Sequence, residues 1–136
     1  MGGVEIALDT APRSVPLARR WLAEVLGPAS RYDTDVARLL LSEVVTSAML
    51  QARSGLVVRV EDSGVRLRVE VASARSTRDA RSSPAAPGSD LHVVDLLAAA
   101  SGTCGDGDDR PGTTTWFELL PVDARRASQV SSGVGA

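Results

Sequence analysis

The stretch LVVRVEDSGVRLRVEVA, residues 56–72, decides the fold class. Two apolar runs, Leu56–Glu61 and Val65–Ala72, flank the tripeptide Asp62-Ser63-Gly64, and Gly64 supplies the positive φ that a short hairpin loop usually needs. Along the second run charged side chains alternate with apolar ones, and the apolar positions are Val65, Leu67, Val69 and Val71. The pattern predicts an antiparallel hairpin with one buried face and one wetter face.

Two amphipathic helices are predicted on the N-terminal side of this hairpin. Apolar residues recur at three- and four-residue spacing from Val15 to Leu26, which predicts the first helix. The second helix is expected to begin near Asp33 or Asp35, because either carboxylate suits an N-cap, and to run to about Arg53.

The remaining segments complete an α+β chain. Ser73–Ser89 has no large apolar side chain and reads as a flexible lid loop. The other predicted segments are a strand over Val4–Leu8, a helix over Leu91–Ala100, a glycine- and acid-rich strand or turn over Gly102–Gly112 and a strand over Thr113–Leu120. Consecutive strands with helices segregated elsewhere predict a two-layer sandwich, in which a mixed, mainly antiparallel sheet packs on about three helices.

The composition suits one small protein domain and excludes several classes of function. The chain has 136 residues, a formal net charge of −2 and 3% aromatic residues. A nucleic-acid binder driven by charge or by base stacking is therefore not expected. We expect a single domain over residues 1–121, with a lid loop at 73–89 and a disordered tail at 122–136.

Cysteine and histidine are too few for a disulfide framework or a structural zinc site. Cys104 and His92 are the single residues of their types, which fits a reducing cytoplasm. Glu5 and Asp9 stand where a signal peptide would carry basic residues. The most apolar stretch, Leu91–Ala100, is far shorter than a membrane span. A cytoplasmic protein with no membrane partner is expected.

Residues 42–52, SEVVTSAMLQA, resemble the N-box helix of the histidine-kinase-like ATPase superfamily. Within it they are most similar to the small, single-domain anti-sigma-factor serine kinases. Other segments that fit this family follow in its order: ARRWL (18–22), DVARLLL (35–41), VRLRVEV (65–71), LHVVDLLA (91–98) and GTTTWFEL (112–119). The resemblance covers roughly residues 4–121 and implies a Bergerat-type ATPase fold.

The resemblance also implies roles for two residues of the second helix. In family members that bind ATP, the N-box glutamate is a base or positions water, and an asparagine one turn later ligates Mg²⁺. Glu43 holds the first position and Ser47 the second, and residues four apart share one helix face. Serine is shorter than asparagine, so direct ligation of Mg²⁺ is not expected. The alternative for Glu43 is a polar residue at the helix edge that pairs with an arginine.

Other nucleotide-site positions of the family are also altered. Ser73 stands where the family has the aspartate that accepts a hydrogen bond from adenine, and Gly88-Ser89-Asp90 replaces a Gly-x-Gly turn at the phosphates. Thr113–Thr115 match the family's phosphate-side Gly-Thr segment, with Thr113 and Thr114 as the expected nucleotide-site positions, although β-branched threonines also suit an ordinary strand. The three departures, at Ser47, Ser73 and Asp90, would together weaken ATP binding by about 4–6 kcal/mol if they are additive. The resemblance therefore implies a degenerate ATP site with no metal.

The expected function is regulatory binding of a protein, with no cofactor and no enzymatic activity. The resemblance implies a sigma factor or an anti-anti-sigma factor as the partner. One alternative is an active serine kinase that uses ATP and Mg²⁺. In that case Glu43 and Thr113 or Thr114 are the residues that still serve the reaction. Another is a structural subunit that forms a homodimer through its first helix and an open sheet edge.

Overall fold

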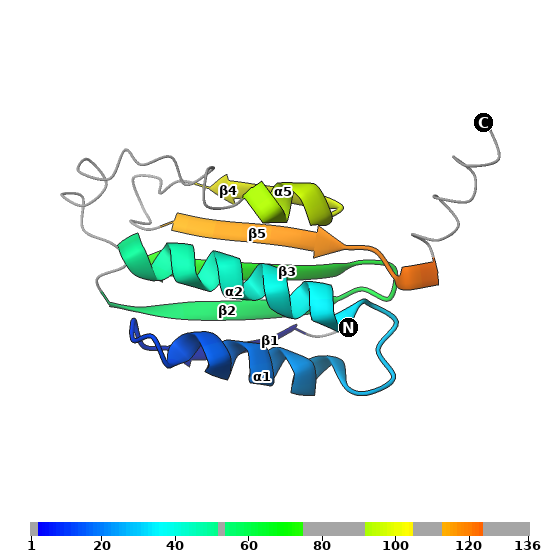
Figure 1. Cartoon of the computed structure of the whole chain (residues 1–136), viewed down its shortest axis with the longest axis horizontal. Helices are drawn as coiled ribbons and strands as arrows, with labels where there is room; N and C mark the ends of the chain where they lie inside the picture. Colours follow the sequence, from blue (N-terminus) through cyan, green and yellow to red (C-terminus); the bar gives the residue numbers. More distant parts are fainter. Residues whose placement is uncertain (1–2, 52–53, 75–91, 105–112, 124–136) are drawn as a thin grey trace.

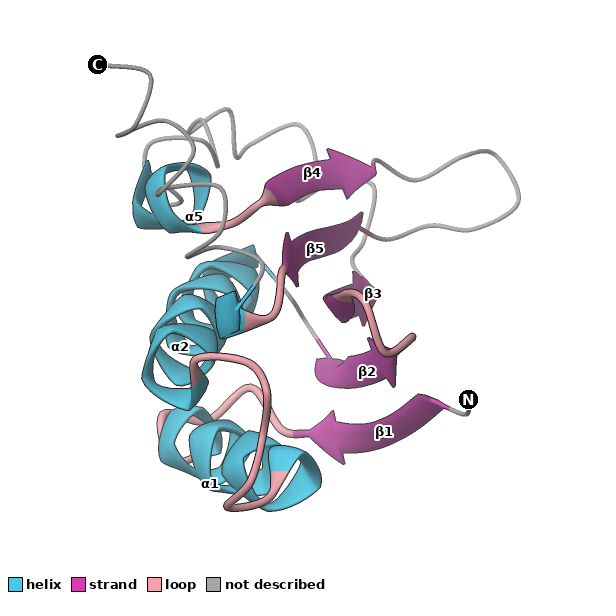
Figure 2. Ribbon diagram, turned by 90° about the vertical axis from the view of Figure 1, so that its right-hand side faces the viewer, coloured by secondary structure: helices cyan, strands magenta, loops and turns pink. Residues whose placement is uncertain are grey.

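The computed structural model describes residues 3–51, 54–74, 92–104 and 113–123. It is an α+β fold in two layers, with one five-stranded sheet and three helices on one of its faces (Figures 1 and 2). The elements in chain order are β1 (Gly3–Leu8), α1 (Ser14–Leu26), α2 (Thr34–Gln51), β2 (Ser54–Asp62), β3 (Leu67–Ala74), α5 (His92–Leu97), β4 (Ala100–Cys104) and β5 (Thr113–Leu119). The predicted fold class is confirmed.

The described strands form a purely antiparallel sheet. Their order is β1-β2-β3-β5-β4, and each neighbouring pair runs antiparallel. The parallel pair that a mixed sheet requires does not occur among these strands. β2 and β3 form a hairpin, and β5 pairs with β3 on one side and with the preceding β4 on the other. β3 is therefore the central strand, and β1 and β4 lie at the two edges.

The β2–β3 hairpin forms where it was predicted, but its loop is longer. Asp62 pairs with Leu67, and the Ser63 N–H donates a hydrogen bond to the Arg66 carbonyl at 3.0 Å. Gly64 has a φ of +93°, as the predicted turn requires. Val65 was expected to be buried on the strand, but it lies in the loop and is 71% exposed.

The boundaries of the helices follow local capping and long-range pairing. Asp33, one of the two predicted caps, accepts a hydrogen bond from the Val36 N–H at 3.1 Å, so α2 begins at Thr34. The predicted helix over Leu91–Ala100 is too long, because α5 ends at Leu97 and the chain then enters β4. Pairing with β5 overrides the helix propensity of this alanine-rich segment.

The boundary residues of the lid and the acidic turn also belong to strands. Ser73 and Ala74 end β3, although they were assigned to the lid. Gly102–Cys104 belongs to β4, which is the strand alternative for this segment. The rest of the predicted lid, the rest of the turn and the tail from residue 124 lie outside the described residues. The Val122 N–H donates to the Arg31 carbonyl at 2.8 Å, so the described chain continues past the predicted domain end at 121.

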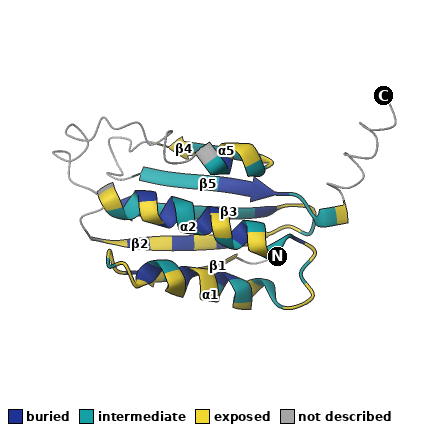
Figure 3. Ribbon diagram, viewed as in Figure 1, coloured by how far each residue is buried: buried dark blue, intermediate teal, exposed yellow. Residues whose placement is uncertain are grey.

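The hydrophobic core fills the space between the helices and the inner face of the sheet (Figure 3). Alternation along each strand sends every second side chain into this space. The largest side chains with less than 2% exposure include Leu22 of α1, Leu40, Leu41, Val44 and Val45 of α2, Leu56 and Val58 of β2, Leu67, Val69 and Val71 of β3, and Phe117 of β5.

The outer face of the sheet carries charged side chains that pair with one another. The Arg68 Nε lies 2.7 Å from a Glu70 carboxylate oxygen, and its Nη1 lies 3.0 Å from Glu118. Arg66 Nη1 contacts the other Glu118 oxygen at 2.9 Å. The Arg68 guanidinium also stacks 4.1 Å from the centroid of the Trp116 ring. Burial lowers the pKa of Arg68, but the hydrogen bonds to Glu70 and Glu118 together with their negative charges raise the pKa overall.

A buried tyrosine joins the loop between α1 and α2 to the β2–β3 hairpin. The Tyr32 hydroxyl donates to Asp62 Oδ1 at 2.7 Å, and the Gly64 N–H donates to the same oxygen at 2.8 Å. Arg31 Nη1 donates to the Gly64 carbonyl at 2.7 Å. Burial, followed by the hydrogen bond to Asp62, raises the pKa of Tyr32 to about 12. We name these four residues the hairpin clamp.

Tyr32→Phe should lower the free energy of unfolding by about 1.5–3 kcal/mol, because it removes a hydrogen bond to a charged acceptor. The folded pKa of about 12 lies above the ordinary value of 10.0. The stabilisation by the hydroxyl is therefore complete below pH 10 and is lost as the pH rises through 12. Urea unfolding at pH 8 and pH 11 would measure both effects. An equal loss of stability between these pH values in wild type and variant would contradict this account.

Gly102→Ala should destabilise the fold by about 1–3 kcal/mol, because an added Cβ would lie 2.9 Å from the Trp116 ring. Urea unfolding of the variant measures the loss. Trp116→Leu in the same chain supplies the control, since the smaller side chain removes the overlap. A cost of Gly102→Ala that is the same in both backgrounds would show that the ring is not responsible.

Candidate functional site

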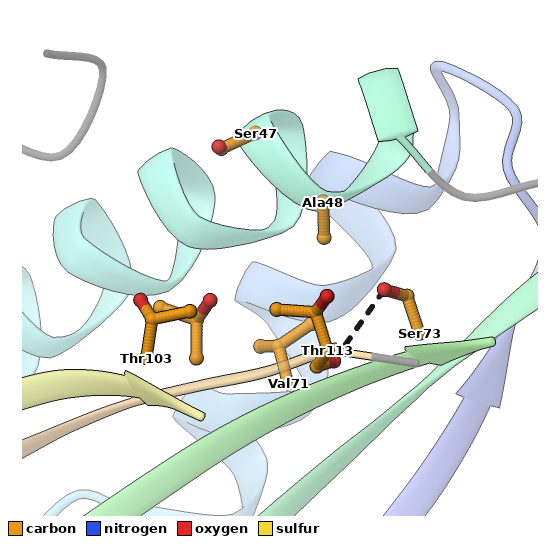
Figure 4. A pocket seen from close by; sticks show the side chains of 7 residues that line it. Ser47, Ala48, Val71, Ser73, Thr103 and Thr113 are labelled. Carbon is orange, nitrogen blue, oxygen red and sulfur yellow. Dashed lines mark hydrogen bonds between the residues drawn. The ribbon is translucent and has the colours of Figure 1, made fainter. Parts of the chain in front are cut away.

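A small pocket lies between the C-terminal half of α2 and the sheet (Figure 4). Ser47 and Ala48 line it from α2, and the other lining residues are Val71 and Ser73 of β3, Thr103 of β4, and Thr113 and Thr115 of β5. In Figure 4 the Ala48 side chain points from the helix toward the strands, and the hydroxyls of Ser73 and Thr113 lie on the strands facing it. Four elements that are distant in sequence therefore supply one site.

The pocket forms because the inner side chains of β3 and β5 become smaller toward one end of the sheet. At the closed end Leu67 pairs with Leu119, and Val69 pairs with Phe117. At the pocket end the corresponding pairs are Val71 with Thr115 and Ser73 with Thr113. Shorter, polar side chains leave space under α2 that large apolar side chains fill elsewhere.

Hydroxyl groups dominate the polar chemistry of this pocket. The Ser73 hydroxyl donates to the Thr113 carbonyl at 3.4 Å, which is long for a hydrogen bond. The hydroxyls of Ser47, Thr103 and Thr115 make no hydrogen bond with any other residue in the described part of the chain. Ser47 and Ser73 are 7% and 6% exposed. These side chains thus present neutral donors and acceptors to whatever occupies the space.

The pocket is small and lacks a charged lining residue among those described. The space open to the centres of water molecules is about 20 Å³. A space of this size has room for about one water molecule between the described walls.

The structure brings three of the predicted site residues together. Ser47, Ser73 and Thr113 line the same pocket. Glu43 lies one helical turn before Ser47 but does not line the pocket, and it forms no ion pair with a described residue. The interpretation of Glu43 as the partner of an arginine thus finds no support in the described structure.

Thr114 does not share this site, although it was predicted together with Thr113. It pairs with Ala72 and Cys104, and successive side chains of a strand point to opposite faces, so Thr114 belongs to the outer face. Gly88 and Asp90, the predicted residues at the phosphate side, lie outside the described residues. Their predicted role stays a prediction.

Four lining residues, Ala48, Val71, Thr103 and Thr115, are not among the predicted site residues, although Thr115 ends the threonine segment that resembles the family. Thr115 follows Thr113 by two positions, so strand alternation alone places both on the inner face and could have identified it. Thr103 lies in the segment that the sequence leaves open as a strand or a turn, and no local pattern decides between the two. Its position depends on the pairing of β4 with β5.

The described residues contain no group of three or more histidine, cysteine or acidic side chains that could hold a metal ion. None of the helices in the described segments combines the length and the apolar composition that a membrane span requires. Comparison of the chain with models of protein families and with curated proteins gives no match.

Ser47→Ala should leave the free energy of unfolding unchanged or raise it by up to about 0.5 kcal/mol, because its hydroxyl has no partner in the described structure and alanine favours helix. Leu41→Ala, at a core position earlier in the same helix, should cost about 2–5 kcal/mol and serves as the contrasting control. Urea unfolding of both variants provides the measurement. A large loss in Ser47→Ala would mean that the hydroxyl stabilises the fold and does not simply face the pocket.

Proposed function

We propose that this protein is a regulatory module that binds another protein and has lost nucleotide binding. The observation that carries the proposal is the composition of the pocket between α2 and the sheet. The residues that stand at the metal and adenine positions of the resembled kinases, Ser47 and Ser73, line one pocket, and both are neutral hydroxyls. The proposal takes the fold to be of the Bergerat type, in which this location holds ATP.

The chemistry of Ser73 supports the loss of ATP binding. A carboxylate at that position would accept a charge-assisted hydrogen bond from adenine, which contributes about 1.5–3 kcal/mol. The Ser73 hydroxyl instead contacts the Thr113 carbonyl of the neighbouring strand. A loss of this size weakens binding by roughly ten- to a hundredfold.

The proposed partner is a sigma factor or an anti-anti-sigma factor in a bacterial cytoplasm. This choice follows the resemblance of residues 42–52 and of the other segments that fit the family in its order. It is an argument by analogy, since the same fold serves many functions.

A second candidate function is the active serine kinase, and the state of Glu43 favours it. The carboxylate forms no ion pair with a described residue and lies one helical turn from Ser47. A carboxylate without an ion pair to a described residue is available to accept a proton, which is the role of a general base. The homodimeric subunit is a third candidate, because β1 and β4 each have one edge without a described neighbouring strand.

A calorimetric titration with ATP, with and without Mg²⁺, distinguishes the first two candidates. We expect no saturable heat at millimolar nucleotide for the wild type. The variant Ser47→Asn/Ser73→Asp/Asp90→Gly should gain binding, because it restores the metal ligand, the adenine acceptor and the glycine of the phosphate turn. Micromolar binding by the wild type, followed by phosphate transfer to a serine of an anti-anti-sigma protein, would establish the kinase instead.

A matched control and a partner assay complete this test. The variant Thr46→Asn places the same amide one residue away on an exposed position of α2 and should gain nothing. Purified sigma factors and anti-anti-sigma proteins are then titrated against the wild-type chain without nucleotide. Failure of every such protein to bind would overturn the regulatory proposal.

A further inference from the structure

Two threonines of the pocket face one another across the strands β4 and β5. Thr103 is the register partner of Thr115, and both line the pocket beneath α2. In Figure 4 Thr103 projects from the sheet toward the helix that carries Ser47 and Ala48. Neither threonine hydroxyl forms a hydrogen bond with another residue in the part of the chain that the structure describes. Two neighbouring hydroxyls of the pocket therefore have hydrogen-bonding capacity that these segments leave unused.

The hydrogen-bond pattern of the sheet brings these two side chains close together. The N–H of Ala99, directly before β4, donates to the Glu118 carbonyl at 2.8 Å, so the backbone of Glu118 points toward β4. Backbone groups of a strand alternate between its two neighbours, so Thr115, three residues earlier, points its N–H and C=O toward β3. Thr103 and Thr115 are consequently a non-hydrogen-bonded pair, in which the Cα atoms lie only about 4.5 Å apart. One small molecule can contact both hydroxyls at once.

The space beside the two threonines suits a single water molecule. About 20 Å³ is open to the centres of water molecules. One water needs about 10–15 Å³ on this measure and at least about two polar partners. Thr103 and Thr115 supply two partners, and each hydroxyl can both donate and accept a hydrogen bond. Cavities that stay empty in proteins are lined by apolar groups, whereas this one is lined mainly by hydroxyls.

The other side chains of the pocket are less suited to bind this water. The Ser73 hydroxyl already donates to the Thr113 carbonyl, and these two residues pair on the ladder between β3 and β5. Ser47 lies on α2, across the space from the sheet. The side chains of Ala48 and Val71 present only apolar atoms. The threonine pair on β4 and β5 is therefore the place where two available hydroxyls lie side by side.

We propose that the pocket binds one ordered water molecule that bridges the hydroxyls of Thr103 and Thr115. The water would enter from the side of Thr103, which is exposed, whereas Thr115 is half-buried. A water that bridges two protein groups is nearly as favourable in enthalpy as a direct hydrogen bond. It would link the edge strand β4 to β5 at the end of the sheet where large apolar side chains are lacking. The inference goes beyond the proposed function, because it does not depend on which partner the protein binds.

A crystal structure of the whole chain tests the site directly. We expect density for a water within about 2.5–3.0 Å of the Oγ1 atoms of both Thr103 and Thr115. Thr115→Val keeps the shape of the side chain without the hydroxyl, so its crystal should lack this water. Thr114→Val makes the same change on the outer face of β5 and should retain it. A wild-type crystal with no density at this position, or with a side chain of the protein there, would overturn the proposal.

Urea unfolding of the threonine variants measures whether one water serves both hydroxyls. Thr103→Val and Thr115→Val should each lower the folding equilibrium constant by about fivefold, the effect of one hydrogen bond. The double variant should also lose about fivefold, since either substitution alone already breaks the bridge. A loss of about twenty-five-fold would mean that the two hydroxyls act independently, which contradicts a shared water. Thr114→Val should change the constant by less than about twofold.

Two further measurements locate the effect of the water within the chain. Ser47→Ala removes the hydroxyl on the helical side of the pocket, and its crystal should keep the water. Loss of the water in Ser47→Ala with retention in Thr115→Val would assign the site to α2 and overturn the proposal. Amide hydrogen exchange at Gly102 and Cys104, whose N–H groups point toward β5, should become about fivefold faster in Thr115→Val than in Thr114→Val. Equal exchange in the two variants would overturn the linkage of β4 to β5 through the water.

Discussion

The burial of the inner face of β3 beneath α2 is the constraint on which the rest of the molecule depends. Leu67, Val69 and Val71 are at most 1% exposed, and each such burial contributes about 1.5–3 kcal/mol. β3 is the central strand, with β2 and β5 as its neighbours. Without its packing, α2 would lose the surface that it covers, and the two halves of the sheet would separate. The pocket is located where this apolar packing ends.

Much of the fold was predictable because its signals are local. The alternation of Val69 and Val71 with charged residues and the turn at Gly64 are enough to identify the hairpin from the amino-acid sequence. The errors occur where distant residues decide the outcome. The alanines after Leu97 favour helix by propensity, but pairing of β4 with β5 makes Ala100 a strand residue. No local pattern reports the position of β5.

The site was predictable only in part, for a similar reason. Resemblance to a kinase helix indicated Ser47, and order along the chain indicated Ser73 and Thr113, which line one pocket. Thr113 and Thr114 are neighbours in the sequence, so the resemblance suggests one site for both. In a strand, however, neighbouring side chains point to opposite faces of the sheet, and Thr114 lies on the outer face. Thr103 required knowledge of which strand lies beside β5. The amino-acid sequence also does not show whether Glu43 forms an ion pair, because that depends on where the arginines lie in the folded chain. In the described structure it forms none.

The narrowing of the core toward the pocket has a consequence for local unfolding. Backbone amides exchange with solvent through openings whose free energy reflects the apolar contacts that must be broken. At one end of β3 and β5 those contacts involve Leu67, Phe117 and Leu119, whereas at the other end they involve serine and threonine. Amide protons near Ser73 and Thr113 should therefore exchange sooner than those near Val69 and Phe117. Local unfolding of the sheet should therefore begin at the end where serine and threonine line the pocket. A ligand in the pocket would slow amide hydrogen exchange first at that end.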